Sequence, residues 1–251
     1  MVAAVFAIAA AIGVWAAERY WGLWGLLRGV LASALWHRSA RTRVSFSALL
    51  KVHAGDRYVL ARTPLRPEAF GPFGGVYHVE VAAAETLDAC EFNPTSSAPN
   101  ERDLRGFVPG GRLLQLVRWF QTGRDRESAD QCLLRELREE LRETGADRLV
   151  GLIDALRFRF VRTVAEPPSR VPGRSYRQFR YFHVYELDPE YAQSENFVAA
   201  ALEEAASNVN LLAVTSANIT AGRVGTAVIA HHAEYLFRRR ASRPDLPQPI
   251  R

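Results

Sequence analysis

The sequence predicts an α+β protein in which a two-helix transmembrane hairpin precedes a mixed α/β domain. Three observations predict this. Two runs of sixteen almost wholly apolar residues lie within the first 37 positions. From residue 44, strand-like, loop and helical segments alternate. A helix over 128–144 separates leucines from glutamates by face. We therefore divide the chain into a two-helix membrane region, 1–37, a domain, 38–240, and a basic, proline-containing tail, 241–251, for which composition predicts disorder.

Composition is that of a folded protein in a reducing compartment. Apolar residues make up 48% of the 251 residues and charged residues 24%, which excludes a collagen-like or low-complexity chain. Cys90 and Cys132 are too few for a disulfide framework, and no cysteine or histidine lies near either at zinc-ligand spacing. The net charge of +5 suits an anionic partner. Because Lys51 is the only lysine among 32 basic residues, the positions of the arginines are more informative than the total charge.

The first element is the hairpin over 2–17 and 21–36. A sixteen-residue helix spans about 24 Å, somewhat less than the hydrocarbon core of about 30 Å, so the flanking side chains of each helix would snorkel or the helix would thin the bilayer. Tryptophans border both segments and basic residues follow Trp36, as in an aromatic belt and a positive-inside signal. This predicts a double-pass protein with both termini in the cytoplasm. No positive residue precedes the first segment, which disfavours a secretory signal, but half of that segment is alanine, which leaves a soluble hairpin or single bent anchor open.

The second apolar segment also predicts how chains associate. Gly25, Gly29 and Ser33 recur every four residues and form a small-residue stripe that lets helices approach closely. Arg28 is a charge inside an apolar segment, which is costly unless it faces water or a partner. Two helices cannot enclose a pore, so we expect a homo-oligomer, most simply a tetramer. Arg28 would then line an anion-preferring path.

The domain that follows reads as strands separated by loops rich in proline and glycine. Tight-turn residues His53–Asp56 join the first two strands. No internal repeat is present in the sequence. The predicted strands are 44–52, 57–62, 76–81, 157–164 and 179–186, and a final helix is predicted from 216 to about 237.

The helix over 128–144 has the most informative pattern. Ser128 and Gln131 form a capping box, and Gly145 is a suitable stop. Two interpretations remain open from the pattern alone. The helix is either a solvated element laced with weak ion pairs, or an oxygen-ligand cluster that binds Mg²⁺ and through it phosphates. The leucine stripe is Leu133, Leu134, Leu137 and Leu141, the acidic face is Glu136, Glu139, Glu140 and Glu143, and the arginines are Arg135, Arg138 and Arg142.

This helix resembles the Nudix box, in which Gly, five residues, Glu and seven residues precede Arg-Glu-aliphatic-x-Glu-Glu-x-Gly-aliphatic. Here Glu127 and seven residues precede Arg-Glu-Leu-Arg-Glu-Glu-Leu at 135–141, and Gly-Pro-Phe-Gly-Gly at 71–75 is similar to the preceding Gly-Gly segment. The resemblance implies a Nudix-like α/β/α sandwich. About fifty residues separate Gly75 from Glu127, and even Gly110-Gly111 leaves fifteen, so a long insertion precedes the helix.

The end of the box departs from the signature. Arg142 and Glu143 stand where the closing Gly and aliphatic residue belong, and in a register anchored on Gly145, Arg142 replaces a metal-ligand glutamate. Both departures, at the start and at the end of the box, favour binding without hydrolysis.

The insertion is similar to that of the SMODS-associated Nudix domain, which in that family follows two transmembrane helices. The segments that carry this resemblance are 103–105, 109–114, 117–120 and 122–127. It implies an effector of cyclic-oligonucleotide-based antiphage signalling (CBASS). A neighbouring CD-NTase synthase makes a cyclic di- or trinucleotide, the Nudix-like domain binds it, and the oligomerised helices form an ion channel or disrupt the bacterial inner membrane. No cofactor is expected in this reading.

Arginines interleaved with aromatic residues independently suit a nucleotide, because guanidinium forks match phosphates and aromatic faces stack on bases. For any one of these residues taken alone, a core or surface role is favoured over ligand binding. The alternative function is a membrane-anchored, Mg²⁺-dependent hydrolase of nucleoside diphosphate derivatives, with Glu127, Glu136, Glu139 and Glu140 as metal ligands or base. An anchored structural protein explains neither the acidic helix nor Arg28. The expected ligand-binding residues are Arg112, Trp119, Arg124, Arg126, Tyr176 and Arg177.

Overall fold

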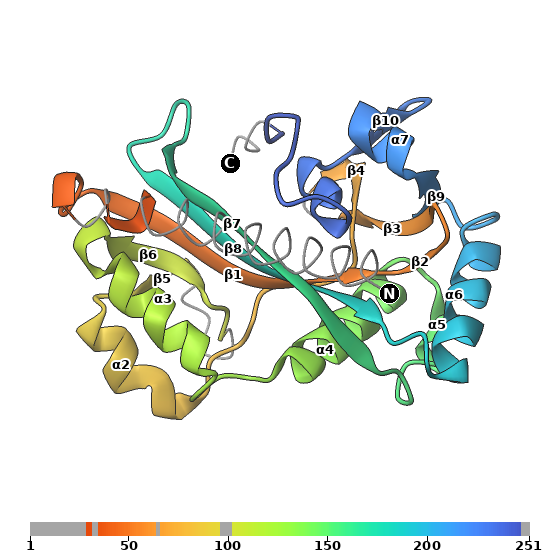
Figure 1. Cartoon of the computed structure of the whole chain (residues 1–251), viewed down its shortest axis with the longest axis horizontal. Helices are drawn as coiled ribbons and strands as arrows, with labels where there is room; N and C mark the ends of the chain where they lie inside the picture. Colours follow the sequence, from red (N-terminus) through yellow and green to blue (C-terminus); the bar gives the residue numbers. More distant parts are fainter. Residues whose placement is uncertain (1–28, 32–34, 64–65, 96–101, 247–251) are drawn as a thin grey trace, which may run out of the picture. The chain divides into compact units, whose positions relative to one another are not determined.

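The computed structural model describes residues 29–31, 35–63, 66–95 and 102–246 (Figure 1). The chain divides into two compact units. Unit 1 comprises Val81–Asp125, Ala165–Tyr181 and the described residues up to Ser45. Unit 2 comprises Phe46–Glu80, Arg126–Val164 and the described residues from Phe182 onward.

Three long strands contribute residues to both units: β1 (Arg41–Lys51), β7 (Phe158–Arg170) and β8 (Arg177–Leu187). They belong to a sheet of order β5-β6-β1-β8-β7. The strands predicted over 157–164 and 179–186 are confirmed, and both are longer than predicted. Between them the chain turns at Gly173, whose φ of 71° lies in the left-handed region that glycine adopts without strain.

Unit 1 is built on β1 and β6 (Arg105–Pro109), which pair antiparallel with Arg43 opposite Phe107. The strand β5 (Asn93–Pro94) continues this sheet. Two α-helices that the sequence did not predict, α2 (Ala84–Ala89) and α3 (Leu113–Thr122), lie in this unit with the short helices η1 (Val81–Ala83) and η2 (Gly110–Arg112). Helix α3 forms because its apolar residues share one face: Leu113, Leu116, Val117 and Phe120 are buried.

Unit 2 contains a second sheet of order β10-β11-β4-β3-β2, with β9 also pairing with β3. The predicted tight turn is confirmed, because His53 pairs with Tyr58 around Gly55. The two strands beside it do not form a long hairpin, however, since β1 neighbours β6 and β8 instead. The strands are β2 (His53–Ala54), β3 (Arg57–Thr63), β4 (Arg66–Gly71), β9 (Leu211–Thr215), β10 (Arg223–Val224) and β11 (Ala227–Ile229).

The predicted helix is α4 (Ala129–Glu143), and its caps are confirmed. Ser128 accepts from the Gln131 backbone N–H while the Gln131 side chain accepts from the Ser128 N–H. Gly145, with φ 72°, follows the helix end. Leu133, Leu137 and Leu141 of the predicted stripe are buried, joined by Cys132. The other helices of unit 2 are α5 (Asp147–Val150), α6 (Ala192–Glu204), α7 (Ser216–Ala221) and η3 (His231–Leu236).

Two predicted elements are wrong. The final helix from 216 stops at Ala221, because Gly222 adopts a φ of 80° and the chain turns into β10 and β11. The predicted strand 76–81 is an extended segment with isolated bridges, Val76 to Ser47 and Val79 to Arg126, and Val81 begins η1.

Part of the tail differs from the expected disorder. Ser242 donates from its N–H and hydroxyl to the wholly buried Glu234 carboxylate at 2.9 and 2.8 Å. Arg243 reaches the same carboxylate at 3.4 Å and donates to the carbonyls of Ile229 and Ile219. Asp245 lies 2.9 Å from His231. This segment is therefore fixed to unit 2 through Glu234, while 247–251 lie outside the described residues.

Most of the predicted hairpin lies outside the described residues, including Gly25, Arg28 and Ser33. Among the residues that the structure does describe, no helix has the length and apolar character needed to cross a bilayer.

Candidate functional site

The fold of unit 2 restores the beginning of the box that the sequence separates. Val79 pairs with Arg126, and His78 and Glu127 exchange two hydrogen bonds, so the chain leaves and re-enters unit 2 at one point. The segment between them, Val81–Asp125, belongs to unit 1. If 80–125 are set aside, residues 76–79 and 126 are the five residues between Gly75 and Glu127. The insertion therefore leaves the Gly-x5-Glu spacing intact in space, and the expectation that it breaks the start of the box was wrong.

Arg135 of α4 holds two carboxylates of the box. Its Nη2 donates to Glu127 Oε1 at 2.6 Å and its Nη1 to Glu136 Oε1 at 2.7 Å. It also donates to the Val76 carbonyl at 2.9 Å. Burial lowers the pKa of the guanidinium, but the hydrogen bonds with Glu127 and Glu136 outweigh burial and raise it. Arg135 is thus a permanent cation among these carboxylates, and Glu139 lies 3.7 Å from it.

Gly74 and Gly75 contact two glutamate side chains of α4, Glu140 and Glu136. The Gly74 N–H donates to Glu140 Oε2 at 2.9 Å. A Cβ on Gly75 would lie 2.0–2.2 Å from the carboxylate atoms of Glu136, so only glycine lets that side chain reach its position. The predicted likeness of this Gly-Gly segment to the one before the box therefore has a structural reason.

The arrangement of these carboxylates does not fit Mg²⁺. Among the described residues, no three Asp, Glu, His or Cys side chains could together hold a metal ion. Glu136 is paired with Arg135, and burial raises the pKa of Glu140 well above its ordinary range. The Gly74 hydrogen bond opposes that rise, while neighbouring carboxylates such as Glu136 add to it. Mg²⁺ requires ionised oxygen ligands in near-octahedral geometry, and the described carboxylates do not supply such a set.

A buried aromatic cluster adjoins Glu127. Arg126 lies over the Tyr77 ring, 4.7 Å from its centroid, and donates to the Glu127 carbonyl. The Tyr77 hydroxyl and His183 Nδ1 are 3.0 Å apart. Burial lowers the pKa of His183 to about 4, and the positive charge of Arg126 adds to that. The imidazole is therefore neutral at neutral pH. Sequence reasoning missed His183, because a lone histidine in a strand carries no distinguishing pattern.

Acid is expected to destabilise the protein through His183. Its folded pKa lies below the ordinary value of 6.5, so the neutral ring contributes stability above pH 6.5 that is lost as the pH falls through about 4. The loss over that window is about 3 kcal/mol. Urea unfolding of the whole chain across the window, beside His183→Phe, measures it. The variant should lack this part of the slope, and parallel curves would show that His183 does not cause it.

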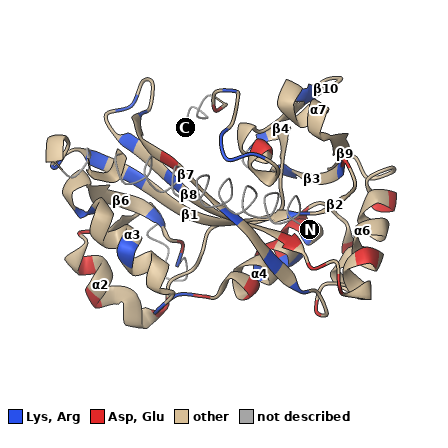
Figure 2. Cartoon of the chain, in the orientation of Figure 1, with Lys and Arg blue, Asp and Glu red and all other residues tan. Residues whose placement is uncertain are grey.

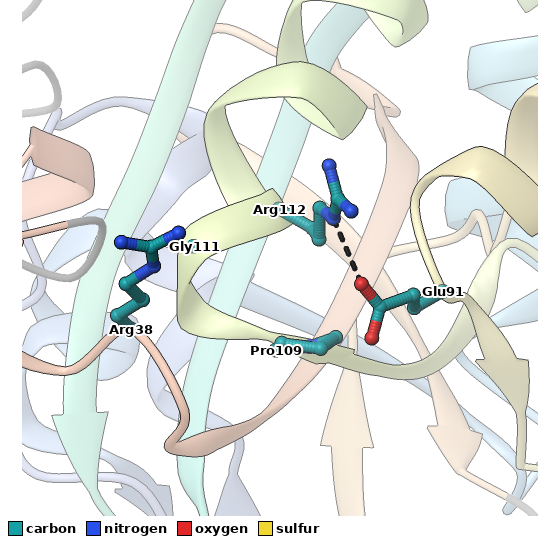
Figure 3. Close-up of a pocket in the computed structure, with 5 residues that line it drawn as sticks. All are labelled: Arg38, Glu91, Pro109, Gly111 and Arg112. Carbon is teal, nitrogen blue, oxygen red and sulfur yellow. Dashed lines mark hydrogen bonds and ion pairs between the residues drawn. The ribbon is translucent and has the colours of Figure 1, made fainter.

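Unit 1 contains a separate cavity of about 190 Å³ lined by Arg38, Glu91, Pro109, Gly111 and Arg112. Figure 3 shows Arg38 and Arg112 on either side of Gly111, with Glu91 facing Arg112. Arg112 Nε donates to Glu91 Oε1 at 2.9 Å, and both side chains are about half exposed. The sequence predicted Arg112 as a ligand-binding residue, counted Arg38 only as a membrane-flanking charge, and gave no reason to single out Glu91.

Glu91 occupies a backbone position that favours glycine. It follows α2 with a φ of 52°. Its N–H donates to the Asp88 carbonyl and the Phe92 N–H to the Leu87 carbonyl, the two bonds of a Schellman motif. A side chain in this left-handed position costs about 1–2 kcal/mol. An exposed ion pair returns only about 0.2–1 kcal/mol, so the contact with Arg112 does not offset that cost.

Glu91→Gly is accordingly expected to be about 1 kcal/mol more stable than Glu91→Ala. Both variants remove the ion pair with Arg112, so their difference isolates the backbone strain at a φ of 52°. Denaturant midpoints of the two full-length variants provide the measurement. Equal midpoints would mean that the left-handed conformation at Glu91 is not strained.

Two aromatic residues of unit 1 meet near the strand that contributes Pro109 to the cavity: Phe107 on β6, and Tyr176 immediately before β8. Arg41 stacks over Phe107 at 3.7 Å from the ring centroid, and Tyr176 meets Phe107 edge-on at 5.4 Å. Arg41 pairs with Pro109, which lines the cavity. Figure 2 shows basic residues at several positions along β1 and β6. Of the predicted ligand-binding residues, Arg112 and Tyr176 therefore lie in one region of unit 1, around Phe107.

The other predicted ligand-binding residues are not gathered with these two. Trp119 is half-buried on α3, and within the described structure its indole Nε1 has no hydrogen-bond partner. Arg124 is exposed beyond α3. Arg177 donates to the Pro168 carbonyl at 2.7 Å. Arg126 belongs to unit 2, against Tyr77.

Gly29 is the described member of the predicted helix stripe. A Cβ there would lie 2.7 Å from Pro167 Cβ, so in this structure the glycine closely approaches β7. Its predicted packing against a second helix stays a prediction.

Comparison with known proteins supplies a family. Residues 41–237, well over half of the chain, match the SMODS-associated NUDIX domain. No curated protein and no solved structure matches the chain. The matched range begins with β1 and ends just after η3, so it includes the box, the insertion and, apart from Arg38, the residues that line the cavity of unit 1. The chain therefore belongs to the SMODS-associated NUDIX domain family.

Proposed function

We propose that the Nudix-like domain binds a cyclic di- or trinucleotide second messenger without hydrolysing it. The observation that carries this proposal is the engagement of the box carboxylates. Glu136 pairs with Arg135 at 2.7 Å and Glu140 accepts from Gly74 at 2.9 Å. A hydrolase of this type would need ionised carboxylates free to share Mg²⁺, whose charge stabilises the departing phosphate. Protein contacts here engage one oxygen of each of these two carboxylates, which supports binding over turnover.

The ligand class is proposed from the chemistry of unit 1. Arg38 and Arg112 border one cavity, Phe107 lies on β6, and Tyr176, immediately before β8, meets the Phe107 ring. Guanidinium groups recognise phosphates, and aromatic rings stack on bases, so the region offers both contacts that a nucleotide needs. A cyclic oligonucleotide presents phosphates and bases but no terminal phosphate for a hydrolase to release.

We further propose that the protein is an effector of antiphage defence in the bacterial inner membrane, a double-pass protein with both termini cytoplasmic. The apolar segments over 2–17 and 21–36 support this, as do Leu35 and Trp36, which are 68% and 76% exposed where a membrane interface would receive them. In a homo-oligomer, such as a tetramer, ligand binding would bias the helices toward a pore or a disrupted bilayer. A CD-NTase synthase would supply the ligand.

A second candidate, a membrane-anchored Mg²⁺-dependent hydrolase of nucleoside diphosphate derivatives, is favoured by two observations. The fold restores the Gly-x5-Glu spacing, and the Glu127–Arg135 pair at 2.6 Å is in place. Against it stand Arg142 and Glu143, where the box should close with Gly and an aliphatic residue. Helix α4 continues through both positions.

A phage-protection assay separates the two functions. Cells would express the full chain with its neighbouring synthase, and Glu136→Gln would be compared with Arg112→Glu. For a binding protein, Glu136→Gln should keep most protection, while Arg112→Glu should lose it, because placing a negative charge beside a phosphate costs at least one charge-assisted hydrogen bond, about 1.5–3 kcal/mol. Loss of protection in Glu136→Gln with Arg112→Glu intact would favour the hydrolase.

A further inference from the structure

We propose that the cavity between Arg38 and Arg112 is a phosphate subsite, and that the Glu91 carboxylate occupies it in the ligand-free protein. The inference rests on the proposed function for the identity of the whole ligand, but not for the phosphate site itself. The subsite combines Arg112 with Arg38 and Glu91, two residues that no sequence pattern placed near it.

The cavity has the size and donors for one phosphate. Its volume of about 190 Å³ is below the roughly 300–1,000 Å³ of pockets that enclose an entire ligand, so it would take a phosphodiester with its adjoining sugar. Arg112 uses Nε for Glu91, and no other hydrogen bond of its guanidinium is formed with a described residue. Arg38 packs against Gly111, where a Cβ would lie 3.2 Å from its Cγ. Arg38 and Arg112 therefore line the same opening.

Glu91 behaves as a stand-in for the ligand. A carboxylate and a phosphate offer guanidinium the same pair of acceptor oxygens, so Glu91 Oε1 marks where a phosphate oxygen would lie. The residue keeps a backbone conformation that glycine adopts more easily, for a contact that is half exposed and weak. Backbone strain that the local contacts do not offset is typical of functional positions. A weak pair is also readily displaced by a doubly contacted phosphate.

The strand β6 indicates where the base of a bound nucleotide would lie relative to the phosphate. Phe107 and Pro109 share one face of β6, about 7 Å apart along the strand. Pro109 lines the cavity, and the Phe107 ring contacts Arg41 and Tyr176. A base attached to a phosphate in the cavity would therefore meet Phe107.

Calorimetry of the full-length chain tests the subsite with cyclic diadenylate, cyclic triadenylate, inorganic phosphate and uncharged adenosine. Arg112→Ala should weaken binding of the cyclic probes at least about ten-fold. Glu91→Gln should tighten it by up to about five-fold, since it removes the competing charge. The matched controls are Arg148→Ala and Glu203→Gln, which break a similarly exposed ion pair at 3.3 Å on α5 and α6 and should leave affinity unchanged.

The outcomes distinguish the subsite from the proposed function. Unchanged affinity in Arg112→Ala, with an unaltered melting temperature, would overturn the subsite even if a cyclic probe binds. Weaker binding in Glu91→Gln would also overturn it, because Glu91 would then be a ligand contact. Binding of inorganic phosphate that depends on Arg112, without any cyclic probe, would uphold the subsite and reject the cyclic-nucleotide function. Binding of no phosphate-bearing probe rejects both.

Discussion

Gly74→Ala is expected to destabilise the protein by about 3–5 kcal/mol. Gly74 has a φ of 122°, and an added Cβ would lie 2.2 Å from the Ala48 carbonyl oxygen. Backbone strain at such a φ costs about 1–3 kcal/mol, and overpacking against a fixed backbone adds about as much. A shift of the backbone at residue 74 would also break the hydrogen bond that the Gly74 N–H donates to Glu140. Urea unfolding of the full chain provides the measurement.

Gly145→Ala is the matched control for that substitution. Gly145 also has a left-handed φ, 72°, but nothing lies within 4 Å of an added Cβ. It should therefore cost only the conformational strain, about 1 kcal/mol. Equal losses in the two variants would mean that the close approach of Gly74 to Ala48 is not a constraint on the fold.

Glu234→Ala is expected to cost about 3 kcal/mol. The carboxylate is wholly buried and holds Ser242 at 2.8 Å and Arg243 at 3.4 Å. Removing one partner of a buried pair leaves the other charge uncompensated, which is more costly than the pair is worth. Limited proteolysis near residue 242 and thermal melting should both report release of this segment. In contrast, Glu203→Ala breaks an exposed pair and should change stability by less than about 0.5 kcal/mol.

The sequence predicted best where a single helix face or strand period decides the structure. The capping box of Ser128, the leucine stripe of α4 and the strands β7 and β8 are local patterns, and all are found. The predicted final helix failed because glycine at 222 ends it, although its apolar residues still enter a core, as Ile219 and Leu236 show. Short edge strands such as β10 and β11 leave little periodic signal in two or three residues.

The site was only partly predictable for a topological reason. The Gly-Gly segment and the acidic helix were recognised separately, but the long insertion concealed that Gly75 and Glu136 touch. Only the pairing of Val79 with Arg126 shows that the insertion leaves the box spacing unchanged. The ion pair of Glu91 with Arg112 joins the end of α2 to η2. It depends on a left-handed residue at the end of α2, and without glycine at that position the sequence does not indicate this conformation.

The most direct test of the account is to recover the ligand after binding. The full-length chain would be incubated with cyclic diadenylate or cyclic triadenylate in the presence of Mg²⁺, and the bound and free nucleotide would be separated, released and analysed by chromatography and mass spectrometry. A parallel incubation with nucleoside diphosphate derivatives would report turnover. The account predicts stoichiometric binding of a cyclic probe, recovered unaltered, and no turnover of the diphosphates. A cleaved cyclic probe, or Mg²⁺-dependent diphosphate turnover that Glu136→Gln abolishes, would contradict it.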